Sequence, residues 1–279
     1  KSMDDGRKTQ RRKTSGGVRP RRTTLACRER KQRRGSVVVR RRRRSLNTEP
    51  VRSVEVEGLV DNYFFNVIDW SADGVAVGLA NALFDWDTRT NTASQLCPDA
   101  PFLNVCGVRC WGTHIFVGDA GGSVHVVDHA QNRVVAQECV HAAEVGCIDR
   151  TGTALVTGGR DGLVRFCDGR DIARATHRVQ LRTGVCGVCA TDRYVAVGEI
   201  GRVSVFDVRM LSGPVCVQES HRSAVKALAW CPWRENVLAS GGGIYDRFVR
   251  VWNVRTEEES AATSAQAQVV GLTWDVEGF

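Results

Sequence analysis

The chain has 279 residues, of which 42% are hydrophobic and 25% charged, and its formal net charge is +8. This length and apolar content suffice for one domain with a substantial core. The longest nearly apolar run, residues 74–84, is interrupted by Asn81 and is far shorter than the ~18 residues of a membrane-spanning helix. We therefore expect no membrane partner, and residues 1–50 lack the apolar stretch of a secretory signal.

Basic residues concentrate at the start of the chain. Residues 1–50 contain 19 Lys/Arg and four acidic residues, whereas residues 51–279 contain 20 basic and 27 acidic ones. A segment so charged buries too little apolar surface to offset the entropy of ordering it, so we predict a disordered tail. Its hypothetical partners are nucleic acid, acidic proteins or a nuclear import receptor, and the alternative is a solvated terminus. Ser36 and Ser45 follow arginines and are predicted phosphorylation sites.

Residues 51–279 repeat one pattern. Successive copies end at Asp87, Asp128, Asp168, Asp207 and Asn253, with spacings of 41, 40, 39 and 46 residues. A period of about 40–45 residues is typical of the four-stranded blades of a β-propeller and disfavours a helical solenoid. We predict an all-β WD-repeat propeller with these approximate repeats: 55–92, 102–135, 139–172, 181–215, 219–260, and the first strand of a sixth within 266–279.

The fifth copy, residues 224–253, shows the pattern most clearly. Three segments with alternating apolar residues predict strands, and Gly241, Gly242 and Gly243 predict a turn in which residues without a Cβ take positive φ. His141 and His221 precede the first strands of the third and fifth copies. We expect both to form hydrogen bonds within their own blades rather than to act in catalysis.

Eleven cysteines raise the question of a metal site. Most lie among Val, Ile, Leu and Ala, where a thiol behaves as a small apolar group. Cys186 and Cys189 have CxxC spacing, yet on a strand they face opposite sides, and no second such pair exists. We expect no metal, no cofactor and a reducing, intracellular compartment. No HExxH, GxSxG or phosphate-binding loop is present, so we expect no enzyme.

Three blocks carry a resemblance to a known family. Pro50-Val51-Arg52 leads to residues 62–71, NYFFNVIDWS, and residues 145–163 contain Val-Gly followed by TGGRDGL. The third block, residues 224–253, contains AVKALAWCPW and GGGIYDRFVRVWN. The chain thereby resembles the Fizzy and Fizzy-related family of WD-repeat coactivators of the anaphase-promoting complex.

The resemblance implies a seven-bladed propeller, of which five blades and one strand are present, so we expect a piece of a longer protein with unpaired strand edges. It also implies a non-catalytic activator that recruits degron-bearing substrates to the anaphase-promoting complex for cell-cycle-dependent degradation in mitosis. The expected location is the nucleus and cytoplasm. The alternative is a WD-repeat scaffold whose basic tail binds nucleic acid or chromatin.

The resemblance also implies site residues. In the family an acidic residue just before a Tyr-Tyr pair helps to receive the arginine of a destruction box. Here that position is Asn62, with Asp61 one residue away, and these two are the candidate receptors. Of the four positions that receive a KEN degron in the family, Gln268 retains the family residue, whereas Glu199, Gly201 and Ile244 are altered. Because the alterations remove polar partners that an asparagine side chain needs, we expect impaired KEN recognition. The family's two docking motifs for the ligase are not in this sequence.

Overall fold

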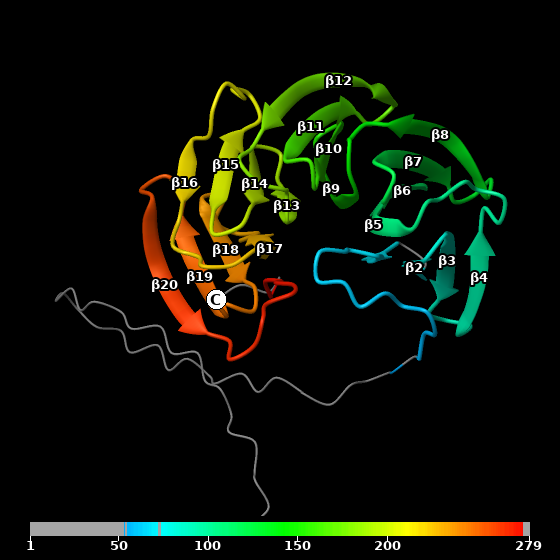
Figure 1. The fold of residues 1–279 in the computed structure, drawn as a ribbon, viewed down its shortest axis with the longest axis horizontal. Helices are drawn as coiled ribbons and strands as arrows, with labels where there is room; N and C mark the ends of the chain where they lie inside the picture. The colour runs from blue at the N-terminus through cyan, green and yellow to red at the C-terminus, as the bar shows by residue number, and fades with distance from the viewer. Residues whose placement is uncertain (1–52, 54, 72–73, 276–279) are drawn as a thin grey trace, which may run out of the picture. The chain divides into compact units, whose positions relative to one another are not determined.

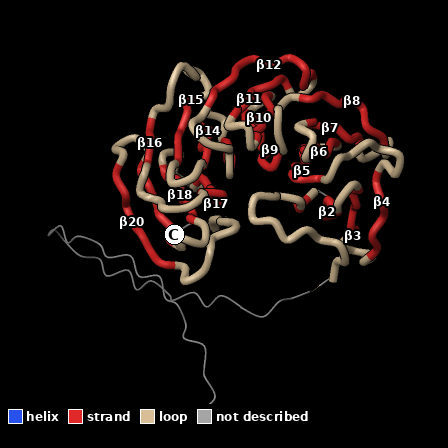
Figure 2. The backbone as a smooth tube through the Cα atoms, viewed as in Figure 1, coloured by secondary structure: helices blue, strands red, loops and turns tan. Residues whose placement is uncertain are grey.

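The computed structural model describes residues 53, 55–71 and 74–275, all within one compact unit that spans 43–279. Strands account for the regular structure of these residues, and none of them is helical (Figures 1 and 2). None of their segments is a helix long and apolar enough to span a membrane. The predicted basic tail, the phosphorylation sites Ser36 and Ser45, and the block Pro50-Val51-Arg52 lie outside the described residues.

Within the described residues, twenty strands form five antiparallel sheets of four strands each, and the strands of each sheet are consecutive in the chain. The first sheet contains β1 (Ile68–Trp70), β2 (Gly74–Leu79), β3 (Ala82–Asp87) and β4 (Thr92–Leu96). The second contains β5 (Val105–Trp111), β6 (His114–Asp119), β7 (Ser123–Asp128) and β8 (Arg133–Cys139). The third contains β9 (Val145–Thr151), β10 (Ala154–Gly159), β11 (Leu163–Asp168) and β12 (Asp171–Gln180). The fourth contains β13 (Gly187–Ala190), β14 (Tyr194–Gly198), β15 (Val203–Asp207) and β16 (Cys216–Gln218). The fifth contains β17 (Val225–Trp230), β18 (Val237–Gly242), β19 (Phe248–Asn253) and β20 (Glu258–Ser264).

The sheets fan around a common axis. The first strands of the sheets, β1, β5, β9, β13 and β17, contact one another in that order and lie innermost, while β4, β8, β12, β16 and β20 lie outermost (Figure 1). Apolar side chains fill the spaces between neighbouring sheets, as in the cluster of Phe116, Val126, Val145 and Leu155 between the second and third. The prediction of an all-β propeller is confirmed.

A glycine of each sheet allows the next sheet to approach. A Cβ on Gly118 would collide with the carbonyl oxygen of Val145, and one on Gly198 with that of Val225. In three more pairs the added Cβ would collide with the side chain of a valine instead: Gly78 with Val105, Gly158 with Val185, and Gly241 with Val269, which follows the fifth sheet. The glycines near the end of each second strand therefore serve close packing between sheets.

The predicted turn in the fifth repeat begins at Gly243, whose carbonyl oxygen accepts the amide of Asp246 at 3.0 Å, but none of its three glycines has the expected positive φ. Gly241 and Gly242 belong to β18 and pair with β17, and the residue of that region with positive φ is Arg247, at 58°. A Cβ on Gly242 would collide with the carboxylate of Asp246, so this glycine too is required by space rather than by its backbone conformation.

The predicted sixth strand is not formed. Residues 265–275 contain no strand, although the amide of Val269 donates to the carbonyl oxygen of Gly242 at 3.1 Å and the indole of Trp274 to that of Ala229 at 3.0 Å. In each of the five sheets the innermost strand pairs with the strand that follows it in the chain. Residues 269–274 have no such strand among the described residues, so no ladder forms.

The cysteines behave as apolar residues. In the described chain ten are free, and seven of these are buried. Burial raises the pKa of Cys147 to about 12, which keeps its thiol protonated. The described residues contain no group of three His, Cys, Asp or Glu side chains arranged to hold a metal ion.

Candidate functional site

A chain of buried hydrogen bonds holds the fifth sheet together. The indole N–H of Trp252 lies 2.7 Å from Ser240 Oγ, which lies 2.8 Å from His221 Nε2, and His221 Nδ1 lies 2.5 Å from a carboxylate oxygen of Asp246. Burial lowers the pKa of His221, although Asp246 opposes this shift. In the neutral imidazole, Nδ1–H donates to Asp246 and the serine hydroxyl donates to Nε2. The expected hydrogen-bonding role of His221 is confirmed.

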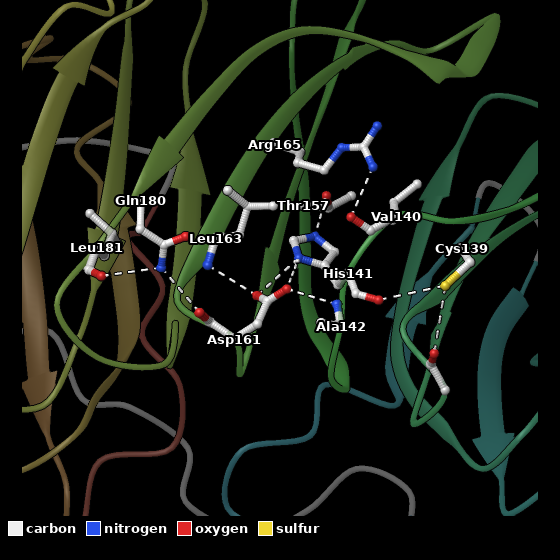
Figure 3. A network of polar contacts seen from close by, with 11 residues as sticks. Cys139, Val140, His141, Ala142, Thr157, Asp161, Leu163, Arg165, Gln180 and Leu181 are labelled. Atoms are coloured by element: carbon white, nitrogen blue, oxygen red, sulfur yellow. Dashed lines mark hydrogen bonds and ion pairs between the residues drawn. The ribbon is translucent and has the colours of Figure 1, made fainter.

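The third sheet has a shorter version of this network (Figure 3). His141 Nδ1 lies 3.2 Å from a carboxylate oxygen of Asp161, and His141 Nε2 lies 2.9 Å from Thr157 Oγ1. Asp161 also accepts the amides of Ala142 and Leu163, which fixes the turn between β10 and β11. The role expected for His141 is therefore also confirmed.

The candidate binding residues gather around one corner of the fourth and fifth sheets, formed by Ser223, Ala224 and Val225. The amide of Val225 donates to the carbonyl oxygen of Glu199 at 3.0 Å, and the amide of Gly201 donates to that of Ser223 at 2.9 Å. The amide of Gly243, next to Ile244, donates to the carbonyl oxygen of Ala224 at 2.9 Å. We call this the Ala224 corner.

Tyr63 brings the remaining candidates to the same corner. Its hydroxyl lies 3.2 Å from the carbonyl oxygen of Ala224 and 3.2 Å from that of Val269. Asn62 precedes Tyr63 and Gln268 precedes Val269, so both lie one residue from this contact. The structure thus brings the hydroxyl of Tyr63, which follows Asn62, to the backbone beside Ile244 and Gln268.

The candidate side chains differ in whether they are free to contact a ligand. Asp61 and Gln268 are exposed, and Asn62 is half-buried, with its side-chain oxygen accepting the amide of Phe64 at 3.0 Å. Glu199 is only 2% exposed, and its carboxylate accepts the amides of Arg182 and Thr183, each at 3.1 Å. Glu199 is therefore a structural acceptor and is not free to bind a ligand.

The surface near the corner is rich in exposed apolar side chains. Ile200, Ile244 and Tyr245 are 57%, 49% and 84% exposed, respectively. These three residues lie in the loops that connect the second and third strands of the fourth and fifth sheets. This surface offers apolar contacts where the resemblance leads us to expect amide and hydroxyl groups.

Sequence reasoning did not identify Tyr63 or Lys226 as parts of this site. The ammonium of Lys226 donates to the carbonyl oxygen of Phe65 at 2.6 Å, and burial lowers the pKa of Lys226. A lysine within the otherwise apolar innermost strand β17 was the available signal, because such a group needs a buried partner.

Comparisons with known proteins agree with this architecture. The family model described as "WD domain, G-beta repeat" matches residues 212–253. In solved structures, a chain of the crystal structure of the mitotic checkpoint complex is 31% identical, with a TM-score of 0.76, over 82% of this chain and 75% of that one. The computationally designed Ika8 protein, at 20% identity and a TM-score of 0.64, shows the fold alone.

Curated relatives indicate the family. The WD repeat-containing protein slp1 of Schizosaccharomyces pombe is 31% identical over 83% of this chain and 49% of its own length. The APC/C activator protein CDH1 of Saccharomyces cerevisiae is 28% identical over 83% of this chain and 42% of its own length, and Protein FIZZY-RELATED 2 of Arabidopsis thaliana is 31% identical over 83% and 49%. The chain spans about half the length of these relatives. It belongs to the Fizzy and Fizzy-related family of WD-repeat proteins.

Proposed function

We propose that this chain is the propeller of a non-catalytic activator of the anaphase-promoting complex, which recruits substrates by binding their degron peptides. The observation that carries the proposal is its similarity, over 83% of its length, to proteins named as APC/C activators, CDH1 and CDC20 of Saccharomyces cerevisiae. A propeller provides a rigid frame from which loops and groove residues bind extended peptides.

The proposed partners are subunits of the anaphase-promoting complex and degron-bearing substrates, and the proposed location is the nucleus and cytoplasm. For residues 1–50, nucleic acid or an import receptor remains a proposed partner, supported by 19 basic residues.

Asp61 and Asn62 are the proposed receptors for the arginine of a destruction box. Asp61 is exposed, so its carboxylate is accessible to a guanidinium in a charge-assisted hydrogen bond. Asn62 already bonds Phe64 N through its side-chain oxygen. That oxygen has a second lone pair, so Asn62 both holds the turn beside Asp61 and can accept from the guanidinium. Gln268 is the polar side chain proposed to contact a second degron near the Ala224 corner.

The alternative, a scaffold that acts only through its basic tail, has no relative in its favour among those named above. The two hypotheses differ in salt dependence. Binding through the tail releases counterions and weakens steeply with salt, whereas degron binding through Asp61 depends on one or two charges.

The test is the affinity of an Arg-x-x-Leu peptide, measured by fluorescence anisotropy at physiological salt. We expect the Asp61→Ala variant to bind about fivefold to tenfold more weakly, since a hydrogen bond between charged groups contributes about 1.5 kcal/mol or less at an exposed position. Asp99→Ala, which removes another exposed acid, is the matched control. Equal affinities of Asp61→Ala and wild type would reject the assigned role.

A further inference from the structure

The loop between β15 and β16 contains an exposed serine, Ser212, which lies three residues after Arg209. An arginine at this spacing is typical of the charge patterns by which basophilic protein kinases choose their substrates. Two threonines of the described chain have an arginine at the same distance: Thr92 after Arg89, and Thr153 after Arg150. The sequence pattern alone therefore does not single out Ser212.

The backbone around Ser212 distinguishes it from the two threonines. Thr92 lies in β4, and Thr153 lies in the two-residue turn between β9 and β10, so both belong to paired hairpins. In the part of the chain that the structure describes, the amides of residues 211–213 donate no hydrogen bond. A Cβ added to Gly213 would have no atom within 4 Å. This loop can therefore enter the active site of another enzyme without breaking a strand pairing.

Arg209 is available to a kinase although it has a partner. Its guanidinium lies 2.6 Å from a carboxylate oxygen of Asp207, but the Arg209 side chain is 68% exposed. Exposed ion pairs contribute little free energy, so acidic groups of a kinase can compete with Asp207 for this arginine.

A contact from the third sheet holds the loop beside β12. His177 Nε2 lies 2.9 Å from the carbonyl oxygen of Leu211, the residue before Ser212. A carbonyl oxygen only accepts, so Nε2 carries the proton of this hydrogen bond. Residues 177–182 and residues 211–214 line one hollow of about 530 Å³. Ser212 thus faces the same hollow as the end of β12.

The hollow has an excess of positive charge. Its ionisable lining residues are His177, Arg178, Arg182, Glu199 and Arg202. Arg202 is paired with Glu199 and Glu219. Arg182 lies 3.9 Å from Glu219, but both side chains are more than half exposed, so this pair is weak. Arg178 forms no ion pair or side-chain hydrogen bond within the described residues. Two guanidinium groups are therefore available to an anion at this place.

We propose that Ser212 is phosphorylated and that Arg178 and Arg182 then hold the phosphate in this hollow. Ser212 Oγ attacks the γ-phosphorus of a nucleoside triphosphate bound to a protein kinase. The bond to the nucleoside diphosphate breaks, and the hydroxyl proton passes to a base of the kinase. This inference does not rest on the proposed function.

The modified serine changes the local balance of charge. A phosphoserine carries about −1.5 to −2 charges at pH 7 and three strong acceptor oxygens. Guanidinium groups bond such oxygens through parallel N–H donors, which makes these contacts stronger than neutral hydrogen bonds. The phosphate thus adds charge-assisted bonds between the loop and the end of β12 to the contact already made by His177. Modification converts an unpaired loop into one fixed to the third sheet.

The first test treats the full chain with a protein kinase that requires arginine three residues before its target. Mass spectrometry measures the occupancy of each site within residues 53–275. We expect Ser212 to be modified about tenfold faster than Thr92 or Thr153, and Arg209→Ala to slow its modification by about tenfold. Arg255→Ala, which removes an exposed arginine from the corresponding loop of the fifth sheet, is the matched control.

The second test incorporates phosphoserine at position 212 and follows its titration by phosphorus NMR. The second pKa of a phosphate is ordinarily about 6, and nearby guanidinium groups lower it because they stabilise the dianion. We expect a midpoint about 0.5 unit lower in the chain with both arginines than in Arg178→Gln/Arg182→Gln. Hydrogen exchange at residues 208–215 should also be slower when the phosphate is present.

The control for the second test is Arg170→Gln/Arg174→Gln. It removes the same charge from two exposed positions of the third repeat that do not line the hollow, so the lower midpoint should persist. His177 and the basic residues 1–50 are unchanged in both double variants and cannot explain a difference between them. Arg178→Lys/Arg182→Lys retains the charge and should retain part of the shift, and far-UV circular dichroism checks that each variant folds.

Two results would overturn the proposal. Modification of Ser212 no faster than that of Thr92 and Thr153 would show that the loop is not a preferred kinase site. Equal midpoints in the two double variants would show that the phosphate stays in solvent and is not held by Arg178 and Arg182.

Discussion

The hydroxyl of Tyr63 lies 3.2 Å from the carbonyl oxygen of Ala224, a contact between residues separated by 161 positions in the chain. The same hydroxyl lies 3.2 Å from the carbonyl oxygen of Val269. Tyr63 therefore connects the segment before the first sheet to the start of the fifth sheet and to the segment that follows it. Burial raises the pKa of Tyr63 to about 12, so the hydroxyl keeps the proton that it donates.

Tyr63→Phe removes this donor and preserves the ring. We expect the free energy of unfolding to fall by about 1 kcal/mol, with a range of about 0.5–3, because two carbonyl oxygens lose a partner at a half-buried position. Urea denaturation followed by tryptophan fluorescence measures the change. Tyr245→Phe alters a tyrosine that is 84% exposed and should have no measurable effect. A Tyr63→Phe variant as stable as wild type would show that the contact contributes nothing to the fold.

Close packing between sheets gives a second prediction. Gly198→Ala places a Cβ against the carbonyl oxygen of Val225, so the fourth and fifth sheets must separate locally. We expect a loss of about 1–3 kcal/mol in stability, typical of an overpacked core. Gly213→Ala is the control, since no atom lies within 4 Å of the added Cβ. The two substitutions should differ clearly in urea midpoint, and equal midpoints would contradict the packing role.

Much of the fold follows from the sequence because propeller repeats are local. A glycine and the valine that it contacts in the following repeat recur with nearly constant spacing, from Gly78 and Val105 to Gly241 and Val269. Period and strand alternation therefore suffice to place the sheets. Of Gly241, Gly242 and Gly243, the first two lie in β18 rather than in the predicted turn, because a glycine required by close packing looks the same in sequence as one required by positive φ.

The candidate site was less predictable for a related reason. Family resemblance identified Asn62 and Gln268, but it did not reveal that Tyr63 connects their neighbourhoods or that the carboxylate of Glu199 is buried on the amides of Arg182 and Thr183. The first fact depends on a contact between distant parts of the chain, and the second on a contact between two loops of the fourth repeat, and neither contact is encoded by a local pattern. The altered residue Glu199 thus proved to be part of the framework.

The buried histidine networks make the stability of the folded chain depend on pH. Burial lowers the pKa of His221 below its ordinary value of 6.5, so the folded state holds the neutral form while the unfolded chain gains a proton at mildly acidic pH. The free energy of unfolding therefore decreases as the pH falls below about 6.5, and the full stabilisation by the neutral histidine is present above that pH. His141, whose pKa burial also lowers, acts in the same direction.

Urea midpoints at pH 7.5, 6.5 and 5.5 measure this dependence, and NMR titration of the His221 ring reports its pKa directly. The Trp252→Phe variant separates the loss of a hydrogen bond from the titration of the histidine, because it removes the indole donor to Ser240 and leaves His221 in place. It should lower stability at every pH by about 1 kcal/mol without removing the acid-side loss. A midpoint that rose on acidification would contradict the assigned protonation state.

The altered residues near the Ala224 corner predict a change in peptide preference. A KEN degron presents a polar asparagine side chain, whereas Ile244 and Ile200 present exposed apolar groups. We expect the wild-type chain to bind a Lys-Glu-Asn peptide no better than a scrambled version.

Gly201 has a φ of 75°, a conformation that asparagine tolerates better than most residues. The nearest atom to an added Cβ is the carbonyl oxygen of His221 at 3.3 Å. Gly201→Asn combined with Ile244→Thr should therefore restore polar partners and raise the affinity for the Lys-Glu-Asn peptide by about tenfold, as expected for two hydrogen bonds of about 0.5–1 kcal/mol each. Fluorescence anisotropy with both peptides measures the gain, and Asp99→Asn controls for an added amide far from the corner in sequence. A wild-type chain that already discriminates between the two peptides would show that the apolar surface does not exclude this degron.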